Sequence, residues 1–287
     1  MVRNRFSGLA RPARTFFKSA VGGLALLLAT AANSGQAAPT PAIPAPPIVL
    51  ATPAMWEIRD ADTTIYLFGT FHTLDGRTVW FGDKLRAAFD ASGELVLETV
   101  VPQDAVSIND AARNQVSETS TDGERRLKPF IAQTQQAMSH GRSMGLTIEH
   151  GADAVLRRLA DEVGKPVGGL ERFEDQLGTL ASIPSLPPSQ AAAAKPAITV
   201  TINDLLGAWT QGNTGAFSTM LAGFEAKSPV AYRMLITDRN ARWGQWIADR
   251  LDRPGTVFVA VGSGHLSGKD SVQQWLAARG IASNRVA

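Results

Sequence analysis

The chain has 287 residues, enough for one large domain or two small ones with a real hydrophobic core. Its formal charge of +2 comes from the first 38 residues, which hold five basic residues and no acidic one, whereas the remainder has 23 basic residues against 26 acidic ones. This mildly acidic balance argues against a nucleic-acid-binding protein, and the lack of cysteine excludes disulfides, thiolate metal ligands and cysteine nucleophiles.

The amino terminus has the pattern of an export signal. A basic stretch precedes the apolar run 21–32, and residues 35–37 offer small side chains for cleavage near Ala37. The apolar run is shorter than the roughly 20 residues that a membrane span needs. We therefore expect a signal peptide over 1–38, with an uncleaved anchor as the alternative, and a periplasmic or secreted protein without stable membrane insertion after cleavage.

A linker and a single domain follow the signal. Residues 39–54 are rich in Pro and Ala and predict an extended tether, so the domain is expected over 55–287. Residues 55–59 alternate apolar and polar side chains, and the turn at 60–63 predicts a hairpin with a second strand over 64–68. That strand runs into Gly69-Thr70-Phe71-His72.

The next segment predicts a strand–helix–strand unit. Residues 83–91 have helical composition, and residues 94–98 form a short apolar run that ends on Glu98. Such a unit implies a parallel pair of strands with a right-handed crossover. Because parallel strands end at the same edge of a sheet, we expect His72 and Glu98 to lie together.

Residues 100–250 predict a large and mainly helical insertion. Helical patterns cover 130–144, 151–162, 198–209, 214–226 and 231–251, and 183–195 predict a loop that starts a helix. Residues 165–171 predict one short strand, which ends on Glu171. In the last helix Arg239 lies on the polar side, where an arginine usually faces solvent.

A partial copy of the first motif stands near the other end of the chain. Residues 256–261 predict a second buried strand, and Gly262-Ser263-Gly264-His265 follows it as a second Gly-x-x-His. A helix is expected over 271–279 and an edge strand over 281–287. The other histidines, His140 and His150, lack the glycine. The matched contexts predict an α/β fold with a mixed central sheet, in which both motif imidazoles meet at one edge.

Two imidazoles and a carboxylate are suited to one divalent metal ion. His72, His265 and Glu98 are the expected ligands, and such a set leaves coordination positions open for water and substrate. An ion held in this way acidifies water and polarises a carbonyl group, which predicts hydrolysis of an amide or an ester. The sequence has no His-Glu-x-x-His helix of the kind found in zincins.

Further charged residues are candidates for supporting roles. Glu171 or Asp75 is expected to supply a second carboxylate, either as a base or as the orienting partner of an imidazole. Arg239 is the candidate cation for a developing oxyanion.

The chain resembles the TraB/PrgY/GumN family from about residue 55 to its carboxyl terminus. The resemblance is carried by Trp56-Glu57-Ile58, the run 66–72, the strand 95–98, Gly169-Leu170-Glu171 with Gln176, Ala208-Trp209 with Gly212, Arg239-Asn240 with Trp243, and the run 259–268.

That resemblance implies an α/β fold related to erythromycin esterases and ChaN-like haem-binding proteins. It also implies a site built from His72, His265, Glu98 and Arg239. The family includes Tiki-type metalloproteases, which depend on manganese or cobalt, and bacterial members linked to polysaccharide gene clusters. We therefore expect an exported metal-dependent hydrolase, a peptidase that uses manganese, cobalt or zinc on a peptide or protein substrate, without a nucleic-acid partner.

Two other functions stay open at this point. The same fold can serve as a non-catalytic module that binds metal, haem or a polysaccharide precursor. Alternatively, His72 and His265 have a purely structural role and cap the ends of their strands.

Overall fold

The computed structural model describes residues 48–102, 139, 141–183 and 200–287. The expected signal over 1–38, most of the linker, most of the helix expected over 130–144 and nearly all of the loop over 183–195 lie outside the described residues. Within the described part of the chain, no helix is long and apolar enough to cross a membrane.

A six-stranded sheet with the strand order β6-β5-β7-β3-β2-β8 forms the centre of the molecule. The strands are β2 (Met55–Arg59), β3 (Thr63–Thr70), β5 (Glu94–Thr99), β6 (Val167–Glu171), β7 (Gly255–Gly262) and β8 (Asn284–Arg285). β6, β5, β7 and β3 run parallel, whereas β2 pairs antiparallel with β3 and β8 pairs antiparallel with β2. The expected mixed α/β sheet is therefore confirmed. A separate parallel pair joins β1 (Val49–Leu50) to β4 (Thr78–Val79).

β7 occupies the middle of the parallel part of the sheet. Its run of apolar residues is buried on both faces, which is typical of a strand with helices above and below it. β7 pairs with β3 on one side and with β5 on the other. β3 and β5 are thus parallel, as expected of a strand–helix–strand unit, but they are not neighbours. A strand from late in the sequence separates them.

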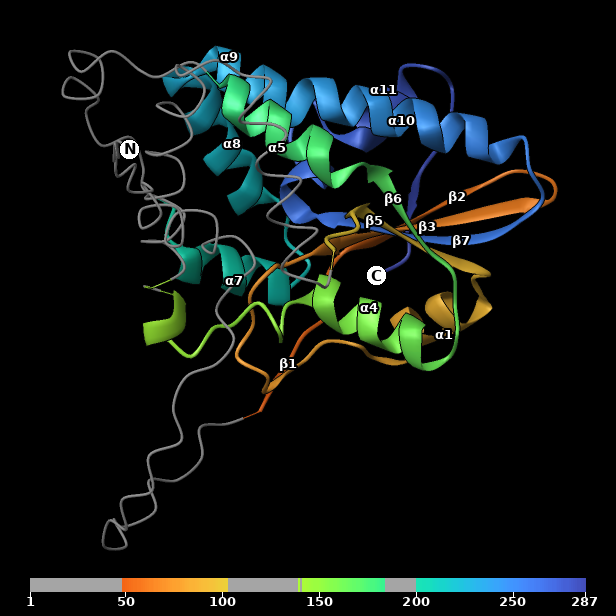
Figure 1. Ribbon diagram of the computed structural model, residues 1–287, viewed down its shortest axis with the longest axis horizontal. Coiled ribbons are helices and arrows are strands. Elements are labelled where there is room, and N and C mark those ends of the chain that lie inside the picture. Colours follow the sequence, from red (N-terminus) through yellow and green to blue (C-terminus); the bar gives the residue numbers. More distant parts are fainter. Residues whose placement is uncertain (1–47, 103–138, 140, 184–199) are drawn as a thin grey trace, which may run out of the picture.

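Helices cover both faces of the sheet (Figure 1). On one face, α1 (Asp83–Ala91), α4 (Ala152–Glu162) and α7 (Ile202–Thr210) pack against a cluster that includes Phe68 and Phe258. On the other face, α10 (Asp238–Leu251) and α11 (Val272–Ala277) pack against Leu67 and Val259. Successive side chains of a strand point to opposite faces, so one apolar run serves both cores.

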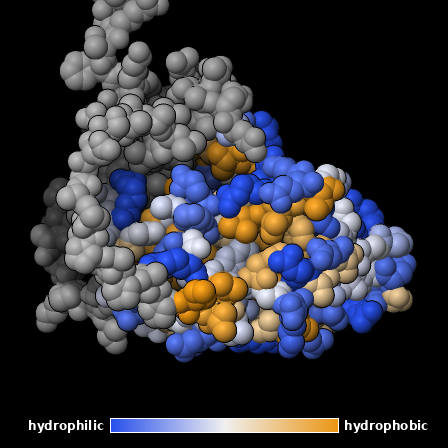
Figure 2. Space-filling view, turned by 90° about the horizontal axis from the view of Figure 1, so that it is seen from below, coloured by the Kyte–Doolittle hydropathy of each residue, from blue (hydrophilic) through white to orange (hydrophobic). Residues whose placement is uncertain are grey.

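Three further helices of the described residues contribute to the region beyond the carboxyl ends of the parallel strands. They are α5 (Phe173–Ser182), α8 (Gly215–Lys227) and α9 (Pro229–Tyr232). The face of the molecule seen in Figure 2 is largely polar with separate apolar patches. Large apolar side chains are exposed at and beside β1 and β4: Ile48, Val49, Leu50 and Val79.

The helical segment expected over 231–251 is confirmed, but it contains a π-helical turn that the sequence pattern did not predict. α9 ends at Tyr232, the π-helical turn covers Arg233–Thr237, and α10 begins at Asp238. A π turn inserts an extra residue into the helix and shifts the register of everything after it. Here the shift directly precedes Arg239 and Asn240, and both of these residues are buried, with 7% and 1% exposure. The expectation that the polar side of this helix faces solvent therefore fails at Arg239.

Candidate functional site

Three neighbouring strands deliver the candidate residues to one edge of the sheet. His72 follows the end of β3, Glu98 lies near the end of β5, and His265 lies in a 3-10 turn over Ser263–Leu266 directly after β7. Because β7 separates β3 from β5, His265 comes from the strand between the other two. The Nε2 atom of His265 lies 3.7 Å from Oε1 of Glu98.

The glycines that begin the two motifs allow close packing at this edge. A Cβ atom on Gly69 would lie 2.7 Å from Oγ of Ser263, which donates a hydrogen bond to the carbonyl oxygen of Thr70. A Cβ atom on Gly262 would lie 3.0 Å from Nε2 of His72 and 3.1 Å from Oε1 of Glu98. The Nε2 atom of His72 and the Glu98 carboxylate thus face the same point above Gly262.

Asn240 sets the orientation of the His265 ring. The amide nitrogen of Asn240 donates to the carbonyl oxygen of Asp270 at 2.7 Å, so its Oδ1 faces Nδ1 of His265, at 2.6 Å. The proton of a neutral imidazole then belongs on Nδ1, and the lone pair of Nε2 faces Nη1 of Arg239. The ring also packs on Trp243, with the ring centroids 4.4 Å apart. Burial lowers the pKa of His265 to about 3, so the ring is neutral at physiological pH.

Asp153 makes the corresponding contact with His72. Its Oδ2 lies 2.7 Å from Nδ1 of His72, and Gly151 just before it packs against the His72 carbonyl group. The negative charge of Asp153 is the main cause that raises the pKa of His72, to about 9. The His72 side chain is 62% exposed, so solvent screens part of this interaction.

Glu98 is a buried carboxylate that is held in its ionised form. Burial alone would raise its pKa, but electrostatic interactions with His265, Arg239 and His72 and a hydrogen bond from the Gly262 N–H lower the pKa of Glu98 to about 2. The hydrogen bond from Gly262 measures 2.6 Å and ends on Oε1. The other oxygen accepts a hydrogen bond from Nη2 of Arg239 at 3.1 Å.

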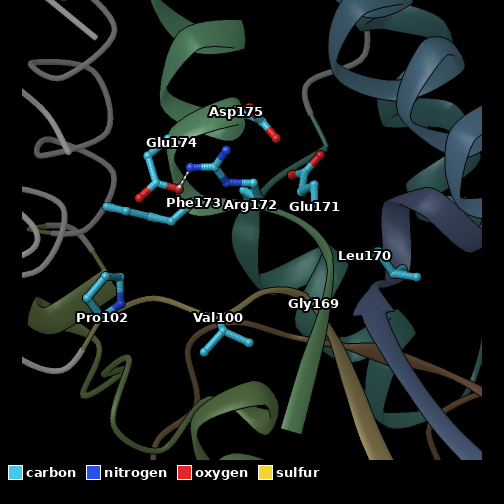
Figure 3. A pocket seen from close by; sticks show the side chains of 9 residues that line it. All are labelled: Val100, Pro102, Gly169, Leu170, Glu171, Arg172, Phe173, Glu174 and Asp175. Carbon is cyan, nitrogen blue, oxygen red and sulfur yellow. Dashed lines mark ion pairs between the residues drawn. The ribbon is translucent and has the colours of Figure 1, made fainter. Parts of the chain in front are cut away.

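Arg239 links the site to Glu171 at the end of β6. Its Nε and Nη2 donate to the two Glu171 oxygens at 3.1 and 2.6 Å, and its Nη1 lies 3.2 Å from Nε2 of His265. Glu98 and Glu171 together raise the pKa of Arg239 against the opposing effect of burial. Figure 3 shows that Arg172 reaches toward Glu174 instead of Glu171. Glu171 therefore pairs with Arg239, and both carboxylate oxygens of Glu171 accept hydrogen bonds from it.

The expected orienting carboxylate of an imidazole is neither Glu171 nor Asp75. Asp75 accepts hydrogen bonds from the N–H groups of Arg77 and Thr78 and pairs with the Arg77 side chain, so it stabilises its own turn. The contact to His72 comes from Asp153. No motif in the sequence marks Asp153, because the approach of its helix to His72 is a tertiary contact.

The donor groups suit a divalent metal ion, although they are not yet arranged around one. Within the described ranges, no three His, Cys, Asp or Glu side chains are spaced to hold one ion as they stand. The lone pair of His265 Nε2 faces Arg239 Nη1, so binding of an ion there requires this contact to break. Both imidazoles nevertheless have Nδ1 held by an oxygen, the usual support of a metal-bound histidine.

A cavity of about 620 Å³ opens onto this site. His72, Glu98, Arg239 and His265 line it together with residues of α4, α5, α8 and the π-helical turn. A smaller cavity of about 290 Å³ also has His72 and His265 in its lining. A third cavity of about 460 Å³ has Glu171 in its lining but neither histidine (Figure 3).

The profile of the TraB/PrgY/gumN family matches residues 54–133 and 107–285. The first match includes His72 and Glu98, and the second includes Glu171, Arg239 and His265. Comparisons with curated proteins and with solved structures found no match.

Proposed function

This chain belongs to the TraB/PrgY/gumN family, and we propose that it is an exported metal-dependent hydrolase that acts on peptides. In this proposal His72, His265 and Glu98 hold one divalent ion, manganese, cobalt or zinc. When bound, the ion would lower the pKa of a water molecule and polarise a substrate carbonyl group.

One observation carries the proposal. Each motif histidine has Nδ1 engaged by an oxygen, from Asp153 for His72 and from Asn240 for His265. Each therefore directs Nε2 toward Glu98. Histidines that only cap strand ends have no need of two separate orienting partners, whereas metal ligands gain both orientation and basicity from them.

The other charged residues of the site would orient Glu98 and stabilise the charge that develops on the substrate. Glu171 fixes Arg239 through two hydrogen bonds, and Arg239 in turn fixes Glu98. The Nη1 group of Arg239 now contacts His265. We propose that this Nη1 group donates a hydrogen bond to the developing oxyanion of the substrate. A preorganised cation at a buried site stabilises such a negative charge strongly.

Two finer parts of the proposal concern fold relationship and location. We propose that the sheet is related to those of erythromycin esterases and ChaN-like proteins, and a solved structure of this protein whose strand order differs from theirs would contradict this. We also propose cleavage after an export signal near Ala37. Amino-terminal sequencing of the protein recovered from the periplasm or medium tests this, and an intact first residue would contradict it.

The decisive experiment for the metal is calorimetric titration of the purified protein with manganese, cobalt and zinc after chelator treatment. We expect one ion per chain, and His72→Ala should abolish binding. His150→Ala is the matched control, because this nearby imidazole contacts Thr147 instead of a carboxylate and is outside the cavity lining. Equal binding by both variants would contradict the proposed ligands.

Hydrolysis is tested separately with a peptide library and each metal in turn. Cleavage products identified by mass spectrometry should appear with the wild type and disappear with Glu98→Gln. If the protein binds metal but cleaves no peptide with any of these metals, it is a metal-binding protein and the proposal of a hydrolase is wrong.

A further inference from the structure

The large cavity over the candidate site has a charged floor and apolar walls. Its charged or titratable lining residues are His72, Glu98, Arg239, His265 and the orienting Asp153. The walls come from β5, α5, α8 and the π-helical turn and include Leu97, Phe173, Leu180, Met220, Phe224 and Ile236. Its volume of about 620 Å³ falls in the range of pockets that bind small molecules or short peptide segments.

The smaller cavity combines apolar and small lining residues. Phe71, Phe217, Met220, Leu221 and Ile236 line it together with Thr70, Gly262, Ser263 and Gly264. Thr70 is 2% exposed, and its Oγ1 has no hydrogen-bond partner among the described residues.

The two cavities share His72 and His265 in their linings, and also Thr73, Met220, Leu221 and Ile236. An extended chain that passes from one cavity to the other therefore runs beside the candidate site. The large cavity would receive an apolar side chain next to that point.

We infer that this site selects peptides with a bulky apolar side chain, such as Leu or Phe, next to the bond that lies over His72 and His265. This inference rests on the proposed function and specifies its substrate. An apolar side chain gains free energy by leaving water, and a difference of one methylene in such a pocket changes selectivity by about 10- to 200-fold. A carboxylate in the same place would lose its hydration among apolar walls without gaining a partner.

The test uses the full chain, with metal removed by chelator, and blocked peptides of equal length that differ at one central position. Fluorescence anisotropy should show the Leu and Phe peptides binding at least tenfold more tightly than the Ala peptide, and the Asp peptide binding more weakly still. Equal affinities for the Leu, Ala and Asp peptides would overturn the inference.

A cavity-filling variant tests where the side chain lies. Ala154 lines the cavity from α4, so Ala154→Leu should reduce the preference for Phe over Ala at least tenfold. Glu162→Leu adds the same side chain at an exposed position of the same helix and should leave the preference unchanged. Circular dichroism confirms that both variants are folded. A preference unaffected in folded Ala154→Leu would also overturn the inference.

Failure of this inference differs from failure of the proposed function. Cleavage without preference for an apolar residue would support the proposed hydrolase and contradict the inferred specificity. Preferential binding of Leu and Phe peptides, with no cleavage in the presence of manganese, cobalt or zinc, would support the inferred specificity and contradict the proposed hydrolase.

Discussion

Replacement of Arg239 by methionine should lower the free energy of unfolding of the metal-free protein by about 3–5 kcal/mol, the usual cost of removing one partner from a buried ion pair. The Arg239 side chain is 8% exposed, and its partners Glu98 and Glu171 are 12% and 6% exposed. Methionine fills similar space but leaves both carboxylates without their cation.

The lowered pKa of Glu98 corresponds to a free energy of similar size. Its fall from 4.5 to about 2 corresponds to about 3 kcal/mol in favour of the ionised form in the folded protein. Arg239 supplies only part of this, together with the histidines and the Gly262 N–H. The loss of two hydrogen bonds to Glu171 accounts for the rest of the expected destabilisation.

The assay is urea unfolding at pH 7 in the presence of chelator, followed by circular dichroism. Arg242→Met is the matched control, because Arg242 is 56% exposed and lies 3.9 Å from Glu171. We expect that control to lose no more than about 1 kcal/mol. A loss below about 1 kcal/mol in Arg239→Met, or equal losses in both variants, would refute the view that a buried ionic cluster organises this site.

Acidification provides a second check on the same variant. In the wild type the folded-state pKa of Glu98 is lowered, so its stabilising contribution is present above its ordinary pKa and is lost as the pH falls toward 2. Without Arg239 the folded-state pKa of Glu98 rises, and the carboxyl group can become neutral while buried. The stability difference between wild type and Arg239→Met should therefore shrink between pH 7 and pH 4, and a constant difference would contradict the charge-based explanation.

Three further substitutions test the geometry of the site. Gly262→Ala places a methyl group 3.0 Å from Nε2 of His72, so it should weaken metal binding strongly and lower the free energy of unfolding by about 1–3 kcal/mol. Gly264→Ala is the control, because its methyl group meets no atom within 4 Å, and it should bind metal as the wild type does. Asp153→Asn should reduce metal affinity about 10- to 100-fold by calorimetry, whereas Asp75→Asn should leave it unchanged. Asn240→Ala removes the partner of the other imidazole and should cost a similar factor in affinity, and unchanged affinity would show that this contact does not support the ligand.

Local structure was largely predictable from the sequence. The bounds of β2 and α1 agree with the alternating pattern of 55–59 and the helical composition of 83–91. Both patterns arise from short-range periodicity, which determines which residues of an element face the core. Glu171 was likewise expected at the end of a strand, and β6 ends there.

The order of the strands and the burial of Arg239 were not predictable in this way. Nothing in residues 64–98 indicates that β7 will separate β3 from β5, because that pairing depends on contacts between distant segments. The polar character of Arg239 and Asn240 suggested solvent. In the structure, the carboxylates of two other strands pair with Arg239, and the Asp270 carbonyl group and the His265 ring pair with Asn240. Asp153 was missed for the same reason, because its role exists only through the contact with His72.

The central position of β7 also affects when the site can form during synthesis. A ribosome that has completed only the segment through Leu251 has already produced β3 and β5, but not the strand that pairs with both. Closure of so long a loop is slow relative to local folding. The centre of the sheet therefore cannot assemble until the segment after Leu251 is available to pair with β3 and β5.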